Sequence, residues 1–279
     1  MVYVWFDALC NYVTALGYGT GGDAYQEWWA GGSRRVQLVG KGVLRFHAVC
    51  WPAMLLSSGQ PLPTDIFVHD YLTAGGRKIS KSSGSGADPA ALAAEYGPDA
   101  VRWWLLREVP RVGDADFTVE RMIARADDEL ANGLGNLVNR VIAMIGKYRD
   151  GRVPGRQPVP PGGENLDAAI RRAGGLIGAA LEEFDFRQAT AAAWAIADEA
   201  NRFINRARPW ELARTGCDGE GGRRLDAVLF TLFVACSALG RELAPFLPDA
   251  AARITRQCTP HGGSLPAARP VFRRLGSAG

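Results

Sequence analysis

The chain has 279 residues, of which 47% are hydrophobic and 22% are charged, and its formal net charge at neutral pH is +3. This composition is ordinary for a globular protein with a buried core, and the small net charge means that any nucleic-acid-binding surface has to be local. The longest apolar run, residues 225–240, is shorter than the roughly 20 residues of a membrane-spanning helix, and the first residues do not form a secretory leader. We therefore expect a cytoplasmic protein without a membrane segment.

The five cysteines are widely separated in the chain, and none of them forms a C-x-x-C pair. Their odd number and their spacing predict neither a disulfide framework nor a zinc-binding knuckle. We expect reduced thiols and no metal site in this chain. The cysteines are Cys10, Cys50, Cys217, Cys236 and Cys258.

Residues 1–117 have the pattern of an incomplete α/β domain. Short β-type runs occur at residues 2–5, 36–39 and 65–68, and a helical stretch with an internal proline occupies residues 43–59. Strands that alternate with helices predict a parallel sheet. Because a parallel sheet needs helices on both faces, these few elements make only part of one. The prediction is a partial Rossmann-type parallel sheet.

After Gly84 the strand pattern ends, and the rest of the chain has a helical pattern. Asp88 is expected to cap a first short helix, and Asp99 is expected to cap a second one. Longer helices are predicted over residues 119–147, 166–183, 187–206 and 225–244.

These helices predict an antiparallel helical bundle over residues 118–258. A Pro/Gly-rich stretch, residues 149–163, is expected to be an exposed loop within it. Residues 259–279 are rich in Gly, Pro and Arg and are expected to form a flexible tail. The predicted fold class is therefore α/β followed by all-α.

One loop carries the clearest chemical signal, and its sequence is Lys78-Ile79-Ser80-Lys81-Ser82. Lysine is a mobile point charge that suits phosphate oxygens, and the glycines and serines around it let a loop close over a ligand. Taken alone, the segment fits a solvated basic surface loop better than a phosphate-binding loop. A strand that ends at His69 precedes it and a helix start follows it, and this context favours the phosphate-binding interpretation.

This order of motifs resembles the K-M-S-K-S region of class I aminoacyl-tRNA synthetases. In that family the loop stabilises the charge on pyrophosphate while an amino acid attacks the α-phosphate of ATP, and each such donor contributes roughly 100- to 1000-fold in rate. The resemblance implies catalytic roles for Lys78, Ser80 and Lys81. It also implies ATP with Mg²⁺ as a substrate, bound by Gly40, Lys81 and Ser82.

Two earlier segments narrow the resemblance to methionyl-tRNA synthetases. Residues 4–12, VWFDALCNY, are similar to that family's V-W-[FL]-D-A-x-x-N-Y motif, and residues 39–54 look like its V-G-K-D-x-x-x-F-H and W-P-A motifs. The resemblance implies a methionine pocket, and aromatic and imidazole groups suit a polarizable thioether. Its residues would be Trp5, Ala8, Tyr12, Val43, His47 and Trp51. Each aromatic residue taken alone also fits an ordinary core position.

A third similarity lies in the helical part, which the resemblance makes an anticodon-binding domain. Residues 130–140, LANGLGNLVNR, are similar to the family's D-L-A-N-x-L-G-N-L-x-x-R stretch, and Arg208-Pro209-Trp210 stands where the family has A-P-W. The resemblance implies that Asn136, Arg140 and Trp210 read the CAU anticodon of tRNA(Met) by stacking and by hydrogen bonds to base edges. The structural alternative is a surface pair beside a capped helix.

The sequence departs from the family at three places. Gly42 replaces the aspartate of G-K-D, whose carboxylate would bind the ribose hydroxyls of ATP, and this predicts a loss of about 1–3 kcal/mol in adenosine binding. Residues 83–85, SGS, replace L-G-N. The first signature of the family, H-x-G-H, does not occur, because none of the three histidines is followed by x-G-H.

These features predict the C-terminal half of a methionine–tRNA ligase. Activation of methionine with ATP and its transfer to tRNA(Met) would need the first half of the nucleotide-binding fold, for example from a separate N-terminal polypeptide. We expect the chain alone to be catalytically inactive, because one signature loop without its partner does not position ATP. Two alternatives stay open: a tRNA-binding module without catalysis, and a synthetase-like paralogue that activates an amino acid for specialised metabolism.

Overall fold

The structure is a computed structural model that describes residues 3–79, 88–214 and 219–276. The chain forms two compact units, which we call the N-terminal unit (residues 1–72 with 111–115) and the helical unit (residues 73–110 with 116–279). This division differs from the predicted boundary after residue 117. The reason is that Ala100 and Trp103, which precede that boundary, belong to the core of the helical unit.

The first element of the N-terminal unit is a helix, α1 (Val4–Thr14), so the predicted strand over residues 2–5 is wrong. Leu9 and Val13 are the buried residues of this helix. Their spacing of four places both side chains on one helix face, and burial of that face outweighs the β-propensity of the first few residues.

The sheet of the N-terminal unit consists of two parallel strands, β1 (Val36–Gly40) and β2 (Asp65–His69), in which Gly40 lies opposite His69. The prediction of a small parallel sheet is confirmed for these two strands. The helix predicted between them forms in three consecutive pieces, η2 (Lys41–Val43), η3 (Phe46–Cys50) and α2 (Trp51–Ser57). Its internal proline lies in the first turn of α2, where its missing N–H is tolerated.

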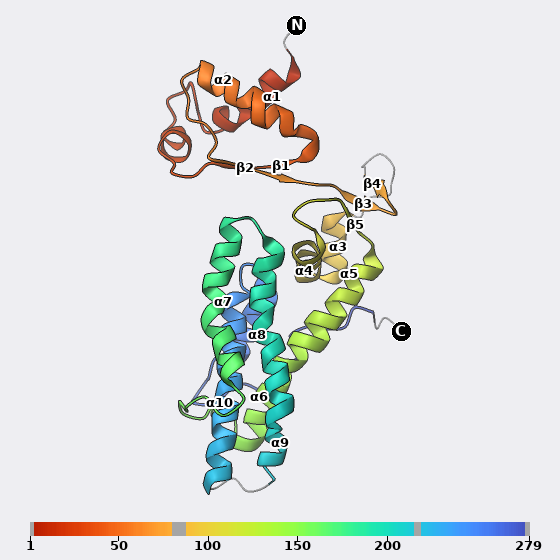
Figure 1. Cartoon of the computed structure of the whole chain (residues 1–279), viewed down its shortest axis with the longest axis vertical. Coiled ribbons are helices and arrows are strands. Elements are labelled where there is room, and N and C mark those ends of the chain that lie inside the picture. Colours follow the sequence, from red (N-terminus) through yellow and green to blue (C-terminus); the bar gives the residue numbers. More distant parts are fainter. Residues whose placement is uncertain (1–2, 80–87, 215–218, 277–279) are drawn as a thin grey trace. The chain divides into compact units, whose positions relative to one another are not determined.

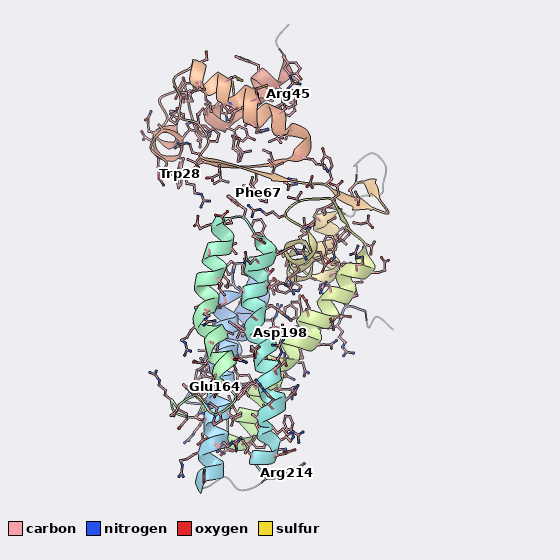
Figure 2. The ribbon with its side chains drawn as sticks, in the orientation of Figure 1. Trp28, Arg45, Phe67, Glu164, Asp198 and Arg214 are labelled. Atoms are coloured by element: carbon pink, nitrogen blue, oxygen red, sulfur yellow. The ribbon has the colours of Figure 1, made fainter. Side chains whose placement is uncertain are left out.

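A small aromatic core holds α1, α2 and the turn η1 (Tyr25–Ala30) together. Trp5 and Tyr12 of α1 pack against this core, so the core fixes the helix face that carries them. Trp28 of η1 points outward and is 64% exposed (Figure 2). The buried members of the core are Leu9, Val13, Tyr25, Trp29, Trp51 and Leu55.

A second sheet was not expected from the sequence, in which the last β-type run is residues 65–68. It contains three short strands in the order β4-β3-β5, namely β3 (Leu72–Ala74), β4 (Arg77–Lys78) and β5 (Ala115–Asp116). A strand of two residues has no period that a sequence pattern could show. Gly75 and Gly76, with φ of 58° and 73°, form the turn between β3 and β4, and Asp116 accepts a hydrogen bond of 3.0 Å from the N–H of Gly76.

In the helical unit the four predicted long helices and the two short helices predicted after Asp88 and Asp99 form, together with further short helices (Figure 1). α7 packs side by side with α8, and α10 packs against both, which confirms the predicted bundle. The connection between α6 and α7 contains neither helix nor strand. The helices are α3 (Pro89–Tyr96), α4 (Pro98–Glu108), α5 (Val119–Arg125), η5 (Ala126–Gly135), α6 (Asn136–Arg149), α7 (Glu164–Glu182), α8 (Phe186–Ala207), α9 (Pro209–Leu212), α10 (Gly219–Glu242) and α11 (Pro248–Gln257).

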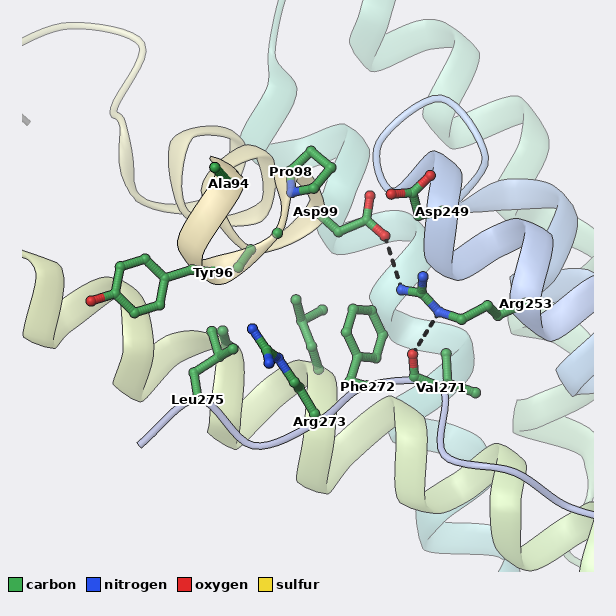
Figure 3. Close-up of a pocket in the computed structure, with 14 residues that line it drawn as sticks. Ala94, Tyr96, Pro98, Asp99, Asp249, Arg253, Val271, Phe272, Arg273 and Leu275 are labelled. Carbon is green, nitrogen blue, oxygen red and sulfur yellow. Dashed lines mark hydrogen bonds and ion pairs between the residues drawn. The ribbon is translucent and has the colours of Figure 1, made fainter. Parts of the chain in front are cut away.

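Asp88 caps α3 as predicted, by accepting a hydrogen bond from the N–H of Ala90, but Asp99 does not cap α4. Asp99 is 4% exposed, and its carboxylate accepts a hydrogen bond of 2.6 Å from the N–H of Ala250 in the first turn of α11. Arg253 of the same helix lies 3.5 Å from this carboxylate (Figure 3). Asp99 is therefore the cap of a helix that is distant in the sequence, and burial raises its pKa.

Replacing Asp99 with asparagine is expected to remove a pH dependence of stability. Because its pKa is raised above the ordinary value of 3.8, the folded protein binds this proton more tightly than the unfolded chain does. Wild type should therefore lose stability relative to Asp99→Asn as the pH rises from 3.8 through the raised pKa of the folded state. Urea titrations of both proteins at several pH values measure this difference, and a difference that does not change with pH contradicts the expectation.

The segment after α11 is not a flexible tail in the part that the structure describes, residues 259–276. Arg253 donates a hydrogen bond of 2.7 Å to the carbonyl oxygen of Val271, and the N–H groups of Leu275 and Gly276 donate to the carboxylate of Asp127. The segment thereby forms one wall of a pocket of about 360 Å³ beside α3, α4 and α11 (Figure 3). Composition favoured disorder here, but an irregular segment is ordered when packed helices satisfy its backbone groups.

Candidate active site and RNA-binding surface

Tyr12 and His47 form the polar centre of the candidate pocket in the N-terminal unit. Tyr12 Oη lies 2.9 Å from His47 Nε2, and His47 Nδ1 lies 2.9 Å from the carbonyl oxygen of Val43. Because a carbonyl oxygen only accepts, Nδ1 is the donor to Val43, and in the tautomer with its proton on Nδ1 the Nε2 atom accepts the hydrogen of the Tyr12 hydroxyl. Burial raises the pKa of Tyr12, so this hydroxyl is protonated at neutral pH. The centre is thus a hydrogen-bonded polar pair that contains neither a carboxylate nor an ammonium group.

Aromatic rings surround this pair. The Trp5 ring stacks on Phe46 with 4.2 Å between ring centres, and its edge faces His47 at 6.4 Å. The Tyr12 ring lies 5.9 Å from the ring of Trp51. The structure therefore brings together four of the six predicted pocket residues.

The other two predicted pocket residues contribute less. Val43 takes part through its carbonyl oxygen, and Ala8, one turn before Tyr12 on α1, is exposed. Phe46 was missed as a pocket residue, although it stands within the F-H part of the motif that identified His47. Trp51 Nε1 is buried and has no hydrogen-bond partner among the described residues, which leaves one donor beside the aromatic rings.

The carboxyl ends of β1 and β2 carry a cluster of charged side chains around Lys41. Its ammonium lies 2.6 Å from Asp114 and 3.0 Å from Asp70, and 4.8 Å from the centre of the Tyr71 ring. The hydrogen bond to Asp114, followed by that to Asp70, raises the pKa of Lys41. Gly40, one of the predicted ATP-binding residues, is the last residue of β1 and lies next to this cluster. Asp70 and Asp114 were not predicted as site residues from the sequence, because only the fold brings them close to Lys41.

The predicted phosphate-binding loop is described at its first residues only. Lys78 belongs to β4, where it pairs with Thr73 of β3, so the signature segment begins in a strand. Ser80, Lys81 and Ser82 lie outside the described residues. The roles of Lys78, Ser80 and Lys81 remain predictions.

Two of the three predicted anticodon-reading residues are in contact in the helical unit. The guanidinium carbon of Arg140, on α6, lies 5.8 Å from the centre of the Trp210 ring, on α9. Asn136 lies one turn before Arg140 on α6 and is exposed. Arg208, with a left-handed φ of 46°, ends α8 and lets α9 begin at the next residue, which places Trp210 beside α6.

A shallow pocket that includes Asn136 also contains a residue that was not predicted from the sequence. Asn136 lines it together with Asn132 and with Arg274 from the segment after α11. Arg274 donates a hydrogen bond of 2.7 Å to the side-chain oxygen of Asn132. No motif pointed to Arg274, because the segment that carries it was expected to be a flexible tail.

A known protein family matches the first half of the chain. The sequence profile described as tRNA synthetases class I (M) matches residues 1–142. The chain belongs to the methionyl-tRNA synthetase family. This confirms the resemblance that the sequence motifs showed.

Individual relatives of the family agree over nearly the whole chain. The chain is 39% identical over 262 residues to the methionine–tRNA ligase of Caldanaerobacter subterraneus subsp. tengcongensis, a match that covers 92% of this chain and 40% of the relative. It is 36% identical over 295 residues to methionine–tRNA ligase 1 of Bacillus cereus, covering 99% of this chain and 44% of the relative. The chain thus spans less than half the length of these methionyl-tRNA synthetases.

Solved structures of the family have the same fold. The methionyl-tRNA synthetase of Mycobacterium tuberculosis, bound by methionyl-adenylate, is similar with a TM-score of 0.87 and 32% sequence identity, over 97% of this chain and 56% of that one. Its free form is similar with a TM-score of 0.86. The predicted fold class, a partial α/β sheet followed by a helical bundle, is confirmed.

The residues that the structure describes contain neither a candidate membrane span nor a candidate metal site. None of the helices in this part of the chain is long and apolar enough to cross a membrane. The His, Cys, Asp and Glu side chains of the same residues form no group of three or more that could hold a metal ion.

Proposed function

We propose that the chain is part of a methionine–tRNA ligase and that its N-terminal unit binds methionine. The observation that carries this proposal is the hydrogen-bonded pair of Tyr12 and His47 among the rings of Trp5, Phe46 and Trp51. A thioether is apolar and polarizable and contacts aromatic rings favourably, whereas a cationic side chain would find no carboxylate in this pair. The predicted pocket residues Ala8 and Val43 complete the proposed site.

The proposed second substrate is ATP with Mg²⁺, at the carboxyl ends of β1 and β2. Ligands of open parallel sheets bind outside these ends. Gly40 brings backbone without a side chain to this edge, and Lys81 and Ser82 would contact the phosphates. The methionine carboxylate would attack the α-phosphate and release pyrophosphate, whose charge Lys78, Ser80 and Lys81 would stabilise.

The third proposed substrate is tRNA(Met), bound by Asn136, Arg140 and Trp210. The contact between Arg140 and the Trp210 ring supports this role, because a guanidinium and an indole held together offer both a hydrogen-bonding edge and a stacking face to an unpaired base. The same contact favours tRNA binding by this chain whether or not it catalyses, so a tRNA-binding module is the second candidate function.

Replacing Tyr12 with phenylalanine is expected to weaken methionine binding about 3- to 10-fold, which is the usual contribution of one hydrogen-bonding group. The variant keeps the aromatic ring but removes the hydroxyl and leaves His47 Nε2 without its partner. Ligand-observed NMR titrations with methionine measure the change. Tyr18→Phe, at an exposed tyrosine of the same unit, is the matched control and should bind methionine like wild type. Equal affinities of Tyr12→Phe and wild type would remove the pocket assignment.

The chain alone is expected to give no methionine-dependent exchange of pyrophosphate into ATP above background. The sequence contains no H-x-G-H motif, so ATP would be held from one side only, and positioning supplies much of the rate of such reactions. Addition of a separately produced polypeptide that carries the H-x-G-H half of the fold should produce exchange. A rate typical of a complete enzyme, measured with the chain alone, would show that the inactivity prediction is wrong.

A further inference from the structure

The hydroxyl of Tyr71 occupies the space that a side chain at position 42 would need. A Cβ atom built on Gly42 would overlap Tyr71 Oη, and the next atom of the tyrosine would lie 3.5 Å away. Both residues belong to the N-terminal unit, so this proximity lies within one compact unit. The Tyr71 hydroxyl, a polar group from another part of the chain, thus fills the space that a side chain at position 42 would occupy.

Contacts on both sides hold Tyr71 in this position. Its backbone N–H donates a hydrogen bond of 2.9 Å to the carboxylate of Asp114, and its ring faces the Lys41 ammonium. Lys41 is held in turn by Asp114 and Asp70. Because the backbone and the ring are both fixed, the hydroxyl has a defined place rather than a mobile one.

This place is the edge of the sheet where a nucleotide would bind. Gly40 and His69 pair at the last position of β1 and β2, and Gly42 and Tyr71 each follow two residues later. Ligands of parallel sheets lie outside the carboxyl ends of the strands. Lys41, whose ammonium faces the Tyr71 ring, is already engaged by two carboxylates.

We propose that the Tyr71 hydroxyl binds the sugar hydroxyls of the nucleotide, in the space left open by Gly42. A phenol can both donate to and accept from a ribose hydroxyl. Part of the adenosine affinity that Gly42 would forfeit is thereby regained through Tyr71. This inference rests on the proposed ATP site.

The test compares ATP with 2′,3′-dideoxy-ATP in titrations of wild type and Tyr71→Phe, followed by ligand-observed NMR. Wild type should bind ATP about 3- to 10-fold more tightly than the dideoxy analogue. Tyr71→Phe keeps the ring that Lys41 faces, and it should bind the two nucleotides equally. Its affinity for the dideoxy analogue should match that of wild type, which shows that the site is intact.

Two variants at position 42 test the same space independently. Gly42→Ala adds a Cβ that displaces the Tyr71 hydroxyl, so it should also lose the preference for ATP although the hydroxyl is present. The double variant Gly42→Asp with Tyr71→Phe places a carboxylate in the vacated space and should restore the preference.

The outcomes separate this inference from the proposed function. An undiminished preference for ATP in Tyr71→Phe would overturn the role of Tyr71 and leave the nucleotide site standing. Absence of saturable ATP binding by wild type would overturn both. Loss of the preference in Tyr71→Phe together with its return in the double variant would support the inference.

Discussion

Replacing Trp210 with alanine is expected to weaken binding of tRNA with a CAU anticodon by about 5- to 150-fold, the usual range for loss of one base–aromatic stack. The indole is held beside α6 by the contact with Arg140, so its face is positioned before RNA binds. Removing it takes away the stacking surface and also the ring that the Arg140 guanidinium faces. Filter-binding titrations of wild type and Trp210→Ala at one fixed salt concentration measure the loss.

Two controls separate anticodon reading from general RNA affinity. Trp28→Ala removes an exposed indole of the N-terminal unit and should leave tRNA binding unchanged. The same tRNA with a changed anticodon should bind wild type more weakly and should distinguish little between wild type and Trp210→Ala. If wild type binds both tRNAs equally, or if Trp210→Ala binds like wild type, the anticodon assignment is wrong.

Replacing Glu129 with alanine is expected to lower the free energy of unfolding of the helical unit by about 3 kcal/mol, as for other buried charges that lose their partner. Its carboxylate accepts a hydrogen bond of 2.6 Å from Trp103 Nε1 and forms ion pairs with Arg107 and Arg125 at 3.0 and 2.9 Å. Without Glu129, a buried indole N–H and two arginines lose this acceptor. Asp198 on α8, labelled in Figure 2, lies close enough to interact with this cluster, and burial raises its pKa.

Glu108 provides the matched control for Glu129. Its carboxylate pairs with Arg125, whose side chain is 36% exposed, so water can replace the lost partner. Glu108→Ala is therefore expected to cost less than about 1 kcal/mol. Urea denaturation followed by far-UV circular dichroism compares the two variants with wild type. Equal losses of stability in both variants would show that the Glu129 cluster holds the helices together no more than a surface ion pair does.

The elements that the sequence predicted well have a long and regular hydrophobic period. The helices α7 and α8 were expected within a few residues of their observed ends, because each buries a stripe of apolar residues at helical spacing. The helix expected over residues 119–147 forms as α5, η5 and α6 in succession, and α10 begins six residues before the expected start. The Asp88 cap was also expected, since its hydrogen bond joins groups two residues apart. Local chemistry is sufficient for features of this kind.

The features that were missed depend on partners far along the chain. Asp99 looks like a cap of its own helix, but its carboxylate accepts from Ala250, 151 residues later. The strands β3 and β5 are too short to show a period, and they form because the chain returns to pair with itself. A local pattern cannot contain the identity of such partners.

The sequence by itself determined the family and named the aromatic, charged and amide side chains of the candidate sites, because motifs record residue types at fixed spacing. Only the tertiary structure decided which of these side chains meet. It pairs Tyr12 with His47, places Arg140 over Trp210 and brings the Tyr71 hydroxyl into the space beside Gly42. The physical reason is that such contacts join residues from separate elements, and their geometry exists only after the core has set the positions of those elements.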